Sequence, residues 1–227
     1  MKACKPPDKK GVLIVVEGID GTGKSTLCKA LSKSLRKKGF DPVMSFEPTN
    51  SPFGKQLRKS FSETKRLPPE EELRLFTEDR KMHVEELIRP ALKDGRIVIL
   101  DRYYISTMAY QGALGIDPEE IRRQNESFAP RPDVAFILEL DPEQALVRIA
   151  EKRGDCPNSF ETLDYLHKVK AVFDALDLPY VIRLDATLPK DEILKQAMDL
   201  ILKRLYAHTR RGASDSYSSG MSGHSTG

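Results

Sequence analysis

A glycine-rich segment near the N-terminus combines the residue types that bind a polyphosphate. It reads Gly18-Ile19-Asp20-Gly21-Thr22-Gly23-Lys24-Ser25-Thr26, matches the pattern GxxxxGK[ST], and lies between an apolar run and a helical pattern that begins at Leu27. Glycines let backbone N–H groups wrap closely around phosphates, and the N-terminus of the following helix favours negative charge. We expect the whole segment to bind a nucleoside triphosphate, with Lys24 at the β- and γ-phosphates and the Ser25 hydroxyl at Mg²⁺. The strand–loop–helix context distinguishes it from a glycine-rich turn without function.

Two carboxylates are candidates for the same chemistry. Asp101 ends the apolar run at residues 97–100, which is the Walker B pattern, and we expect it to hold Mg²⁺ directly or through water. A carboxylate that merely ends a strand is the alternative. Asp20 lies inside the glycine-rich loop itself, where it would repel a polyphosphate unless a metal or an acceptor group came between them.

A helical pattern at residues 70–90 carries an arginine on its apolar side. The apolar stripe contains Leu73, Phe76, Val84 and Leu87, and Arg80 falls on the same face. A buried arginine is costly unless something pairs with it. Phe76 and Arg80 are four residues apart, so together they offer an aromatic platform and a donor fork for a nucleobase. The alternative is a core phenylalanine and an arginine whose head reaches solvent.

The elements that must position these residues alternate along the chain. Continuous Val, Ile and Leu runs, which are typical of strands buried on both faces, occur at residues 12–16, 43–46, 97–100, 134–140 and 180–184. Helical patterns separate them, and two helix starts are marked by Asp117-Pro118 and Asp141-Pro142. The sequence therefore predicts a three-layer α/β fold with a five-stranded parallel sheet flanked by helices. We expect one domain over residues 1–209 and a flexible Ser- and Gly-rich tail over residues 210–227.

Composition narrows the class of protein. The 37 Lys and Arg residues are interleaved with 34 Asp and Glu residues, for a net charge of +3, which does not favour a nucleic-acid partner. The three cysteines form no CxxC pair, which favours a reduced, cytoplasmic setting. The apolar runs are too short for a membrane span, and residues 1–10 do not read as a signal peptide.

Three segments together resemble the thymidylate kinase family. They are the loop EGIDGTGKST, the box Asp101-Arg102-Tyr103 with its continuation Ser106-Thr107-Met108-Ala109-Tyr110-Gln111-Gly112, and the helix segment Leu75-Phe76-Thr77-Glu78-Asp79-Arg80. The resemblance extends over residues 11–206, and neither an NKxD motif nor an LSGGQ motif is present. It implies a P-loop fold and a Mg²⁺-dependent transfer of the γ-phosphate of ATP to dTMP, giving dTDP for dTTP synthesis. Members of the family are commonly homodimers.

The resemblance also implies roles for single residues. Phe76 matches the residue that stacks on thymine, and Arg80 matches the one that bonds its carbonyl. Arg102 and Arg58 are expected to hold the acceptor phosphate, while Asp20 orders that phosphate and Mg²⁺. Thr107, Tyr110 and Gln111 are expected to line the sugar and base pocket, with Tyr110 at the position associated with deoxyribose. The alternatives are a solvated surface charge for Arg58 and an amphipathic packing helix for residues 106–112.

A lid around residues 148–161 is expected to supply the catalytic arginine. One type of family member carries an arginine inside the P-loop, where this sequence has Gly21, and the other type carries it in the lid. We assign Arg153 to the transition-state charge and Arg148 to the neighbourhood of adenine, with a solvated basic helix end as the alternative. The stretch Asp155-Cys156-Pro157-Asn158-Ser159 departs from the family, because an Asp-Arg pair is expected before Phe160-Glu161.

Two other functions remain open at this point. A kinase of another nucleoside monophosphate, or of a nucleoside, would use the same loop with a different acceptor. A nucleotide-binding module without catalysis would bind ATP and release no ADP.

Overall fold

The structure is a five-stranded parallel sheet in the order β2-β3-β1-β4-β5. It is a computed structural model that describes residues 11–61, 66–153 and 162–218, with residues 152–153 and 206–218 described by their backbone only. All neighbouring strands run parallel. The predicted five-stranded sheet is confirmed, with some ends shifted by a residue: the strands are β1 (Val12–Glu17), β2 (Val43–Phe46), β3 (Ile97–Asp101), β4 (Val134–Glu139) and β5 (Val181–Asp185).

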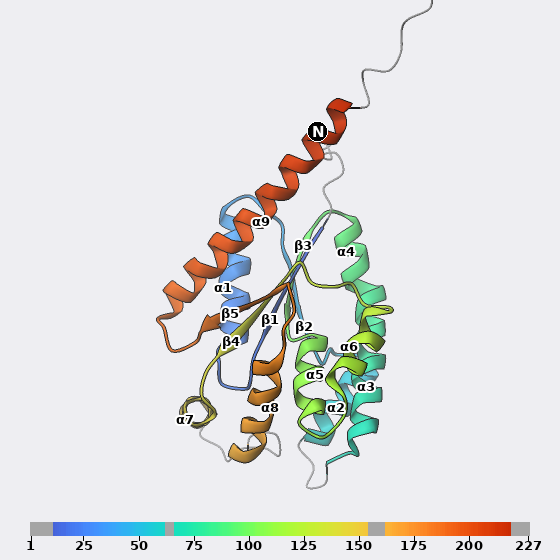
Figure 1. The fold of residues 1–227 in the computed structure, drawn as a ribbon, viewed down its shortest axis with the longest axis vertical. Helices are drawn as coiled ribbons and strands as arrows, with labels where there is room; N and C mark the ends of the chain where they lie inside the picture. The colour runs from blue at the N-terminus through green and yellow to red at the C-terminus, as the bar shows by residue number, and fades with distance from the viewer. Residues whose placement is uncertain (1–10, 62–65, 154–161, 219–227) are drawn as a thin grey trace, which may run out of the picture.

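Helices cover both faces of the sheet and complete the three predicted layers. Figure 1 shows α1 and α9 on one side of the sheet and α3 to α6 on the other. In the described residues the helices are α1 (Lys24–Lys37), α2 (Pro52–Phe61), α3 (Pro69–His83), the π-helical η1 (Val84–Ile88), α4 (Arg89–Lys93), α5 (Tyr104–Gly112), α6 (Pro118–Glu126), α7 (Pro142–Arg153), α8 (Leu163–Ala175) and α9 (Lys190–Ser218).

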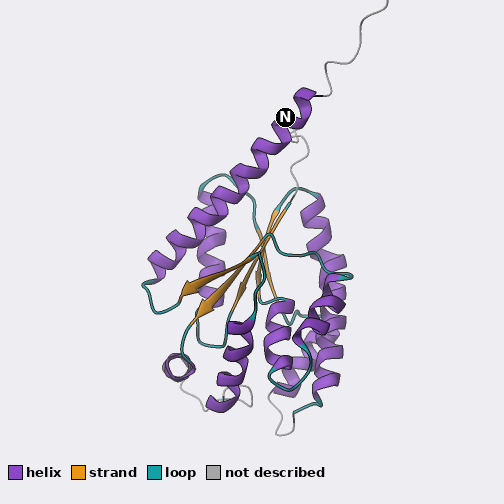
Figure 2. Cartoon of the chain, in the orientation of Figure 1, coloured by secondary structure: helices purple, strands orange, loops and turns teal. Residues whose placement is uncertain are grey.

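Burial explains why the inner strands read as continuous apolar runs. Nearly every residue of β1, β3 and β4 is buried, because these central strands are covered by helices on both faces. The outer strands β2 and β5 are less buried. All five strand arrows point to the same end of the molecule (Figure 2), so the loops that follow the strands gather at one edge of the sheet. Ligands of open α/β sheets bind at this edge.

The helix predicted at residues 70–90 is interrupted. The N–H of Arg89 bonds to the carbonyl of Val84, five residues back, which makes residues 84–88 a π-helical turn between α3 and α4. Pro90 follows at once and has no N–H to donate, so the regular α-helical ladder cannot run through this point. The predicted segment is therefore helical over its whole length, with a π-helical turn that the sequence did not predict, and the face that carries Arg80 lies within α3 as expected.

Two further features concern the ends of elements. Asp117 accepts a hydrogen bond from the N–H of Glu119 at 3.0 Å, so the predicted helix start there is confirmed. Helix α9 continues through residues 210–218, where the sequence predicted a flexible tail, and residues 219–227 lie outside the described part. An existing helix extends at one hydrogen bond per residue without a new nucleus, which lets polar residues continue it. In the described residues no helix is both long and apolar enough to cross a membrane.

Candidate active site

The glycine-rich loop follows β1 and wraps around the start of α1. Gly23 adopts the left-handed conformation, with φ 96°, and precedes the first helical residue, Lys24. The buried Lys24 donates from Nζ to the carbonyl oxygen of Ile19 at 2.7 Å, and Thr22 donates to the same oxygen at 3.0 Å. Burial, together with the positive charge of Arg102, lowers the pKa of Lys24 to about 8. The loop is thus folded on itself with a cation at its centre.

The backbone of α7 packs directly on this loop at Gly21. A β-carbon at Gly21 would lie 2.4 Å from the carbonyl oxygen of Ala145, and the φ of Gly21 is 84°. Both the space and the backbone conformation exclude a larger side chain here without movement of α7. This contact gives a physical reason for glycine at this position of the loop.

Ser25 and Asp101 meet beside the loop. The Ser25 hydroxyl donates a short hydrogen bond to Oδ2 of Asp101, which links the start of α1 to the end of β3. Hydroxyl and carboxylate oxygens are the donors that Mg²⁺ prefers, and Mg²⁺ usually takes its remaining ligands from water and phosphate. The described residues contain no group of three or more His, Cys, Asp or Glu side chains that could hold a metal by itself. The pair therefore fits a Mg²⁺ ion that arrives with a nucleotide.

Arg102 and Asp20 form a partly buried ion pair between the loop and the end of β3. Nη2 of Arg102 donates to Oδ1 of Asp20 at 2.7 Å, and the Tyr110 hydroxyl donates to the other oxygen at 3.1 Å. Lys24 Nζ lies 3.9 Å from Oδ1. Burial alone would raise the pKa of Asp20, but the charges of Arg102 and Lys24 outweigh it and hold that pKa well below its usual range. Asp20 therefore stays ionised.

A buried carboxylate, Glu17, holds the turn that carries Arg102. Arg102 has a φ of 72°, and in the described residues it is the only residue other than glycine with a positive φ. Glu17 accepts from the N–H of Tyr103 at 2.9 Å and from the Ser106 hydroxyl at 2.5 Å, while Nη1 of Arg102 donates to Ser106 at 2.9 Å. Burial raises the pKa of Glu17 to about 7, although these hydrogen bonds and Arg102 oppose the shift.

A cavity of about 230 Å³ lies beside this ion pair. The rings of Phe61 and Phe76 stack with their centroids 6.3 Å apart and form part of its wall. The seven residues that the sequence predicted to bind the acceptor all line this cavity, and Asp20 does so as well: Arg58, Phe76, Arg80, Arg102, Thr107, Tyr110 and Gln111. The structure therefore brings together residues from α2, α3 and α5 that the sequence analysis had selected separately.

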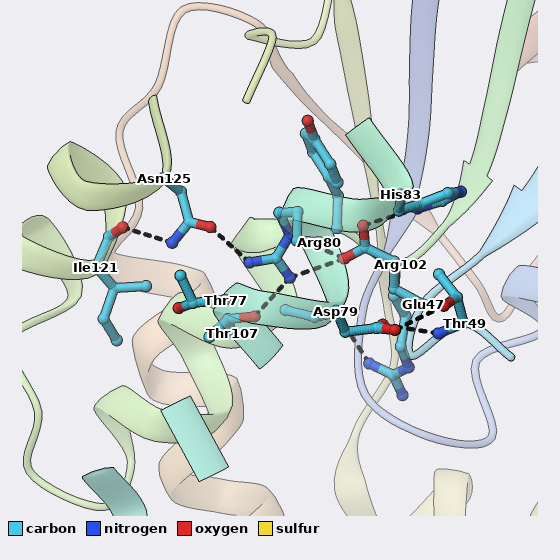
Figure 3. A network of polar contacts seen from close by, with 12 residues as sticks. Glu47, Thr49, Thr77, Asp79, Arg80, His83, Arg102, Thr107, Ile121 and Asn125 are labelled. Carbon is cyan, nitrogen blue, oxygen red and sulfur yellow. Dashed lines mark hydrogen bonds and ion pairs between the residues drawn. The ribbon is translucent and has the colours of Figure 1, made fainter. Parts of the chain in front are cut away.

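Arg80 lies in the wall of this cavity and is 1% exposed. Figure 3 shows its guanidinium between Asn125 and Glu47, with Thr107 as a third neighbour. It donates from Nε to Glu47 at 2.8 Å, from Nη1 to Asn125 at 2.6 Å and from Nη2 to Thr107 at 2.9 Å. The predicted inward position of Arg80 is confirmed, and the alternative of an arginine that reaches solvent is wrong.

The loop after β2 positions Arg58. Arg58 donates to the carbonyl oxygen of Pro48 at 2.6 Å and to the side chain of Asn50 at 3.0 Å. Asp79, which is buried on α3, accepts from the backbone N–H of Thr49 at 2.7 Å and from the Ser51 hydroxyl at 2.5 Å. Arg58 is thus held by a loop that is itself tied to α3, and it is not a freely solvated charge.

Gln111 has one buried oxygen without a partner in the described residues. Its Nε2 donates to Glu72 at 3.1 Å, which fixes the amide, while Oε1 is buried and has no hydrogen-bond partner there. A buried acceptor without a donor costs free energy. Because Gln111 lines the cavity, a ligand with an N–H or O–H group would satisfy this oxygen.

The predicted lid residues are only partly described. Arg148 is half-buried on α7 and does not line the cavity beside Arg102. Arg153 is the last residue of α7, and its side chain lies outside the described part, as do residues 154–161. The roles of Arg148 and Arg153 therefore stay predictions.

The residues of this site that sequence reasoning missed include Glu17, Glu47, Ser106 and Asn125. Glu17 is the last residue of β1 and Glu47 directly follows β2, as Asp101 ends β3, so an acid at the end of each predicted strand was a usable signal. Ser106 lay inside a motif that had been selected for its neighbours. Asn125 carries no such signal, because it lies in an otherwise charged helix.

Comparison with known proteins agrees with the geometry. The model of the thymidylate kinase family matches residues 16–197. A protein of Desulfotalea psychrophila named thymidylate kinase is 46% identical over 193 residues, covering 85% of this chain and 94% of that protein. A protein of Xanthomonas euvesicatoria with the same name is 49% identical over 208 residues, covering 89% and 91%. The chain therefore belongs to the thymidylate kinase family.

Proposed function

We propose that this chain transfers the γ-phosphate of ATP to dTMP and releases ADP and dTDP. One observation carries the proposal: a single cavity joins Phe76, Arg80 and Gln111, which suit a base, to Arg102 and Asp20, which border the P-loop. The acceptor phosphate would thus lie next to the place where the loop holds the donor. Phosphoryl transfer needs little more from the protein than in-line positioning and neutralisation of charge.

On the donor side, the backbone of Gly18 to Thr26 would bind the phosphates of ATP. Lys24 would exchange its bond with the Ile19 carbonyl for the β- and γ-phosphates. This fits a cation whose nearest carboxylate among the described residues is Asp20, at 3.9 Å. Ser25 and Asp101, with Asp20 nearby, would hold Mg²⁺. The bound ion would neutralise charge on the phosphate oxygens.

On the acceptor side, Arg102 and Arg58 would hold the phosphate of dTMP. Arg102 is already oriented by Asp20, Ser106 and Tyr110, so little side-chain entropy is lost when the phosphate binds. Asp20 would keep this arginine aimed at the phosphate oxygens. Tyr110 donates to Asp20 and closes the cavity beside the sugar, which supports a preference for deoxyribose.

At the far end, Phe76 would stack on thymine, while Arg80 and Thr107 would offer polar groups to its edge. The unpartnered Oε1 of Gln111 would accept the ring N–H. A site built from buried hydrogen-bonding groups discriminates strongly between bases, since a mismatched base leaves those groups unpaired.

The test is ADP release from ATP and Mg²⁺ with dTMP, dUMP, dCMP, dAMP, dGMP and thymidine offered separately. We expect dTMP to be used far better than the other five. Preference for another acceptor would refute the assignment of the substrate. Binding of ATP without ADP release for any acceptor would instead favour a nucleotide-binding module.

We further propose that the chain works as a homodimer in the cytoplasm. The described cysteine, Cys28, is free and buried, which is typical of a reducing location. Sedimentation equilibrium at micromolar concentration would test the assembly, with a mass of one chain as the contradicting result.

A further inference from the structure

Asn125 is buried behind Arg80, outside the lining of the cavity. It comes from α6 and is 0% exposed, although asparagine is usually found at the surface. Its Nδ2 donates to the carbonyl oxygen of Ile121 at 2.8 Å, and its Oδ1 accepts from Nη1 of Arg80 at 2.6 Å. The first bond fixes which end of the amide is oxygen, so the second bond presents an acceptor to the arginine (Figure 3).

The contacts of Arg80 leave few of its N–H groups available to a ligand. A guanidinium has five N–H groups. Nε and Nη2 both lie 2.8 Å from Oε2 of Glu47, and Nη2 also donates to Thr107 at 2.9 Å. With the bond from Nη1 to Asn125, three N–H groups donate hydrogen bonds, and Nη2 is also in an ion pair with Glu47. Nη1, the nitrogen that Asn125 holds, keeps one N–H that has no contact in the described residues.

The other side of the guanidinium is equally fixed. The second oxygen of Glu47 lies 3.0 Å from Nδ1 of His83, and Nε2 of His83 lies 2.8 Å from the Ser45 hydroxyl. Glu47 therefore cannot rotate without breaking its buried contacts with His83 and Arg80. Because a guanidinium is planar, a plane fixed by Glu47 and a nitrogen fixed by Asn125 together set the direction of the remaining N–H.

We propose that Asn125 is a positioning residue that directs the remaining Nη1–H of Arg80 toward a carbonyl of the acceptor base, and so sets base selectivity. This proposal rests on the proposed function. A base with a carbonyl accepts this N–H, whereas cytosine presents an amino donor at the corresponding ring position and leaves two donors facing each other. Asn125 itself does not touch the substrate.

The decisive variant is Asn125→Leu, which keeps the branching and the number of side-chain heavy atoms and removes the acceptor. We expect the ratio of kcat/KM for dTMP to that for dCMP to fall roughly tenfold, with the KM for ATP unchanged. The ratio for dTMP to dUMP should stay constant, because these bases carry the same carbonyls. Asn125→Asp keeps an oxygen against Nη1 and should retain most of the wild-type dTMP-to-dCMP ratio.

Thr77→Val is the matched control. Thr77 is buried on α3 in the same region, but its hydroxyl donates to the carbonyl oxygen of Leu73 and it does not line the cavity. For the Thr77→Val variant, the ratio of kcat/KM for dTMP to that for dCMP should equal that of the wild type. If Asn125→Leu does not fold, Asn125→Ala is measured with the same expectation.

Three results would overturn the proposal. An unchanged dTMP-to-dCMP ratio in the Leu or Ala variant would remove the positioning role while leaving the proposed function intact. An equal loss in the Asp and Leu variants would show that Asn125 acts through packing alone. A wild-type enzyme without preference for dTMP over dCMP would refute the proposed function and this proposal with it.

Discussion

Two arginines line the same cavity, the buried Arg80 and the partly buried Arg102, and they are held in opposite ways. Arg102 lies in a left-handed turn and pairs with the ionised Asp20, whose carboxylate also faces Lys24. Arg80 lies in regular helix and is surrounded by Glu47, Asn125 and Thr107. The first arrangement keeps charge available beside the P-loop, where a phosphate must be neutralised. In the second arrangement most N–H donors of Arg80 already have partners, and the direction of the remaining N–H is fixed. This suits recognition of a base more than attraction of an anion.

The largest effect should come from Arg102→Lys. Lysine keeps the charge but cannot reproduce the planar fork that bonds Asp20 and Ser106 at once. We expect kcat/KM for dTMP to fall by roughly 100-fold or more, and to fall equally for every monophosphate tested. Arg74→Lys is the control, since Arg74 is an exposed partner of Glu71 and its ion pair contributes little. Loss confined to one base would contradict the phosphate role.

The next prediction is a pH-dependent change in stability caused by Glu17, which supports the turn that carries Arg102. The folded state holds the Glu17 proton up to a pKa of about 7, against an ordinary value of 4.5, so it binds more protons than the unfolded chain between these values. Stability from this group is therefore present at low pH and lost as pH rises through 7. Relative to Glu17→Gln, the wild type should lose about 2–3 kcal/mol of unfolding free energy between pH 5 and pH 8.

Urea unfolding of both proteins at the two pH values measures this difference. The Gln variant is the reference because it keeps the shape of the side chain and lacks the titration. Parallel changes in the two proteins would show that Glu17 does not titrate in this range.

On the base side, Arg80→Lys should change selectivity more than rate. An ammonium group cannot contact Glu47, Asn125 and Thr107 in one plane, so the orientation of the donor is lost. We expect the ratio of kcat/KM for dTMP to that for dCMP to fall roughly 10- to 100-fold, with the KM for ATP unchanged. Competition assays with both acceptors in one mixture give this ratio directly. An equal fall in kcat/KM for every base would mean that Arg80 acts on all acceptors alike, as Arg102 does, and would contradict a separate role in base recognition.

The contrast also separates what sequence could and could not predict. The P-loop, the strands and the inward face at Arg80 were predictable, because each depends on residues close together in the chain. The partners of the two arginines were not, since Arg102 lies 82 positions from Asp20, and Arg80 lies 33 positions from Glu47 and 45 from Asn125. The π-helical turn at residues 84–88 was missed for a related reason, because Pro90 predicts a break without saying how the preceding carbonyls are satisfied.

The smallest effects should come from two adjacent residues on α5. Ser106 accepts from Arg102 and Thr107 accepts from Arg80, although one peptide bond separates them. Ser106→Ala should raise the KM of all monophosphates by a similar factor, roughly 3- to 10-fold, whereas Thr107→Val should lower the dTMP-to-dCMP ratio by a comparable amount. Each variant is the control for the other, as both remove one buried hydroxyl from the same turn. The prediction fails if Ser106→Ala changes selectivity and Thr107→Val changes KM, or if both variants have the same effect. Either result would show that the phosphate end and the base end of the cavity do not act independently.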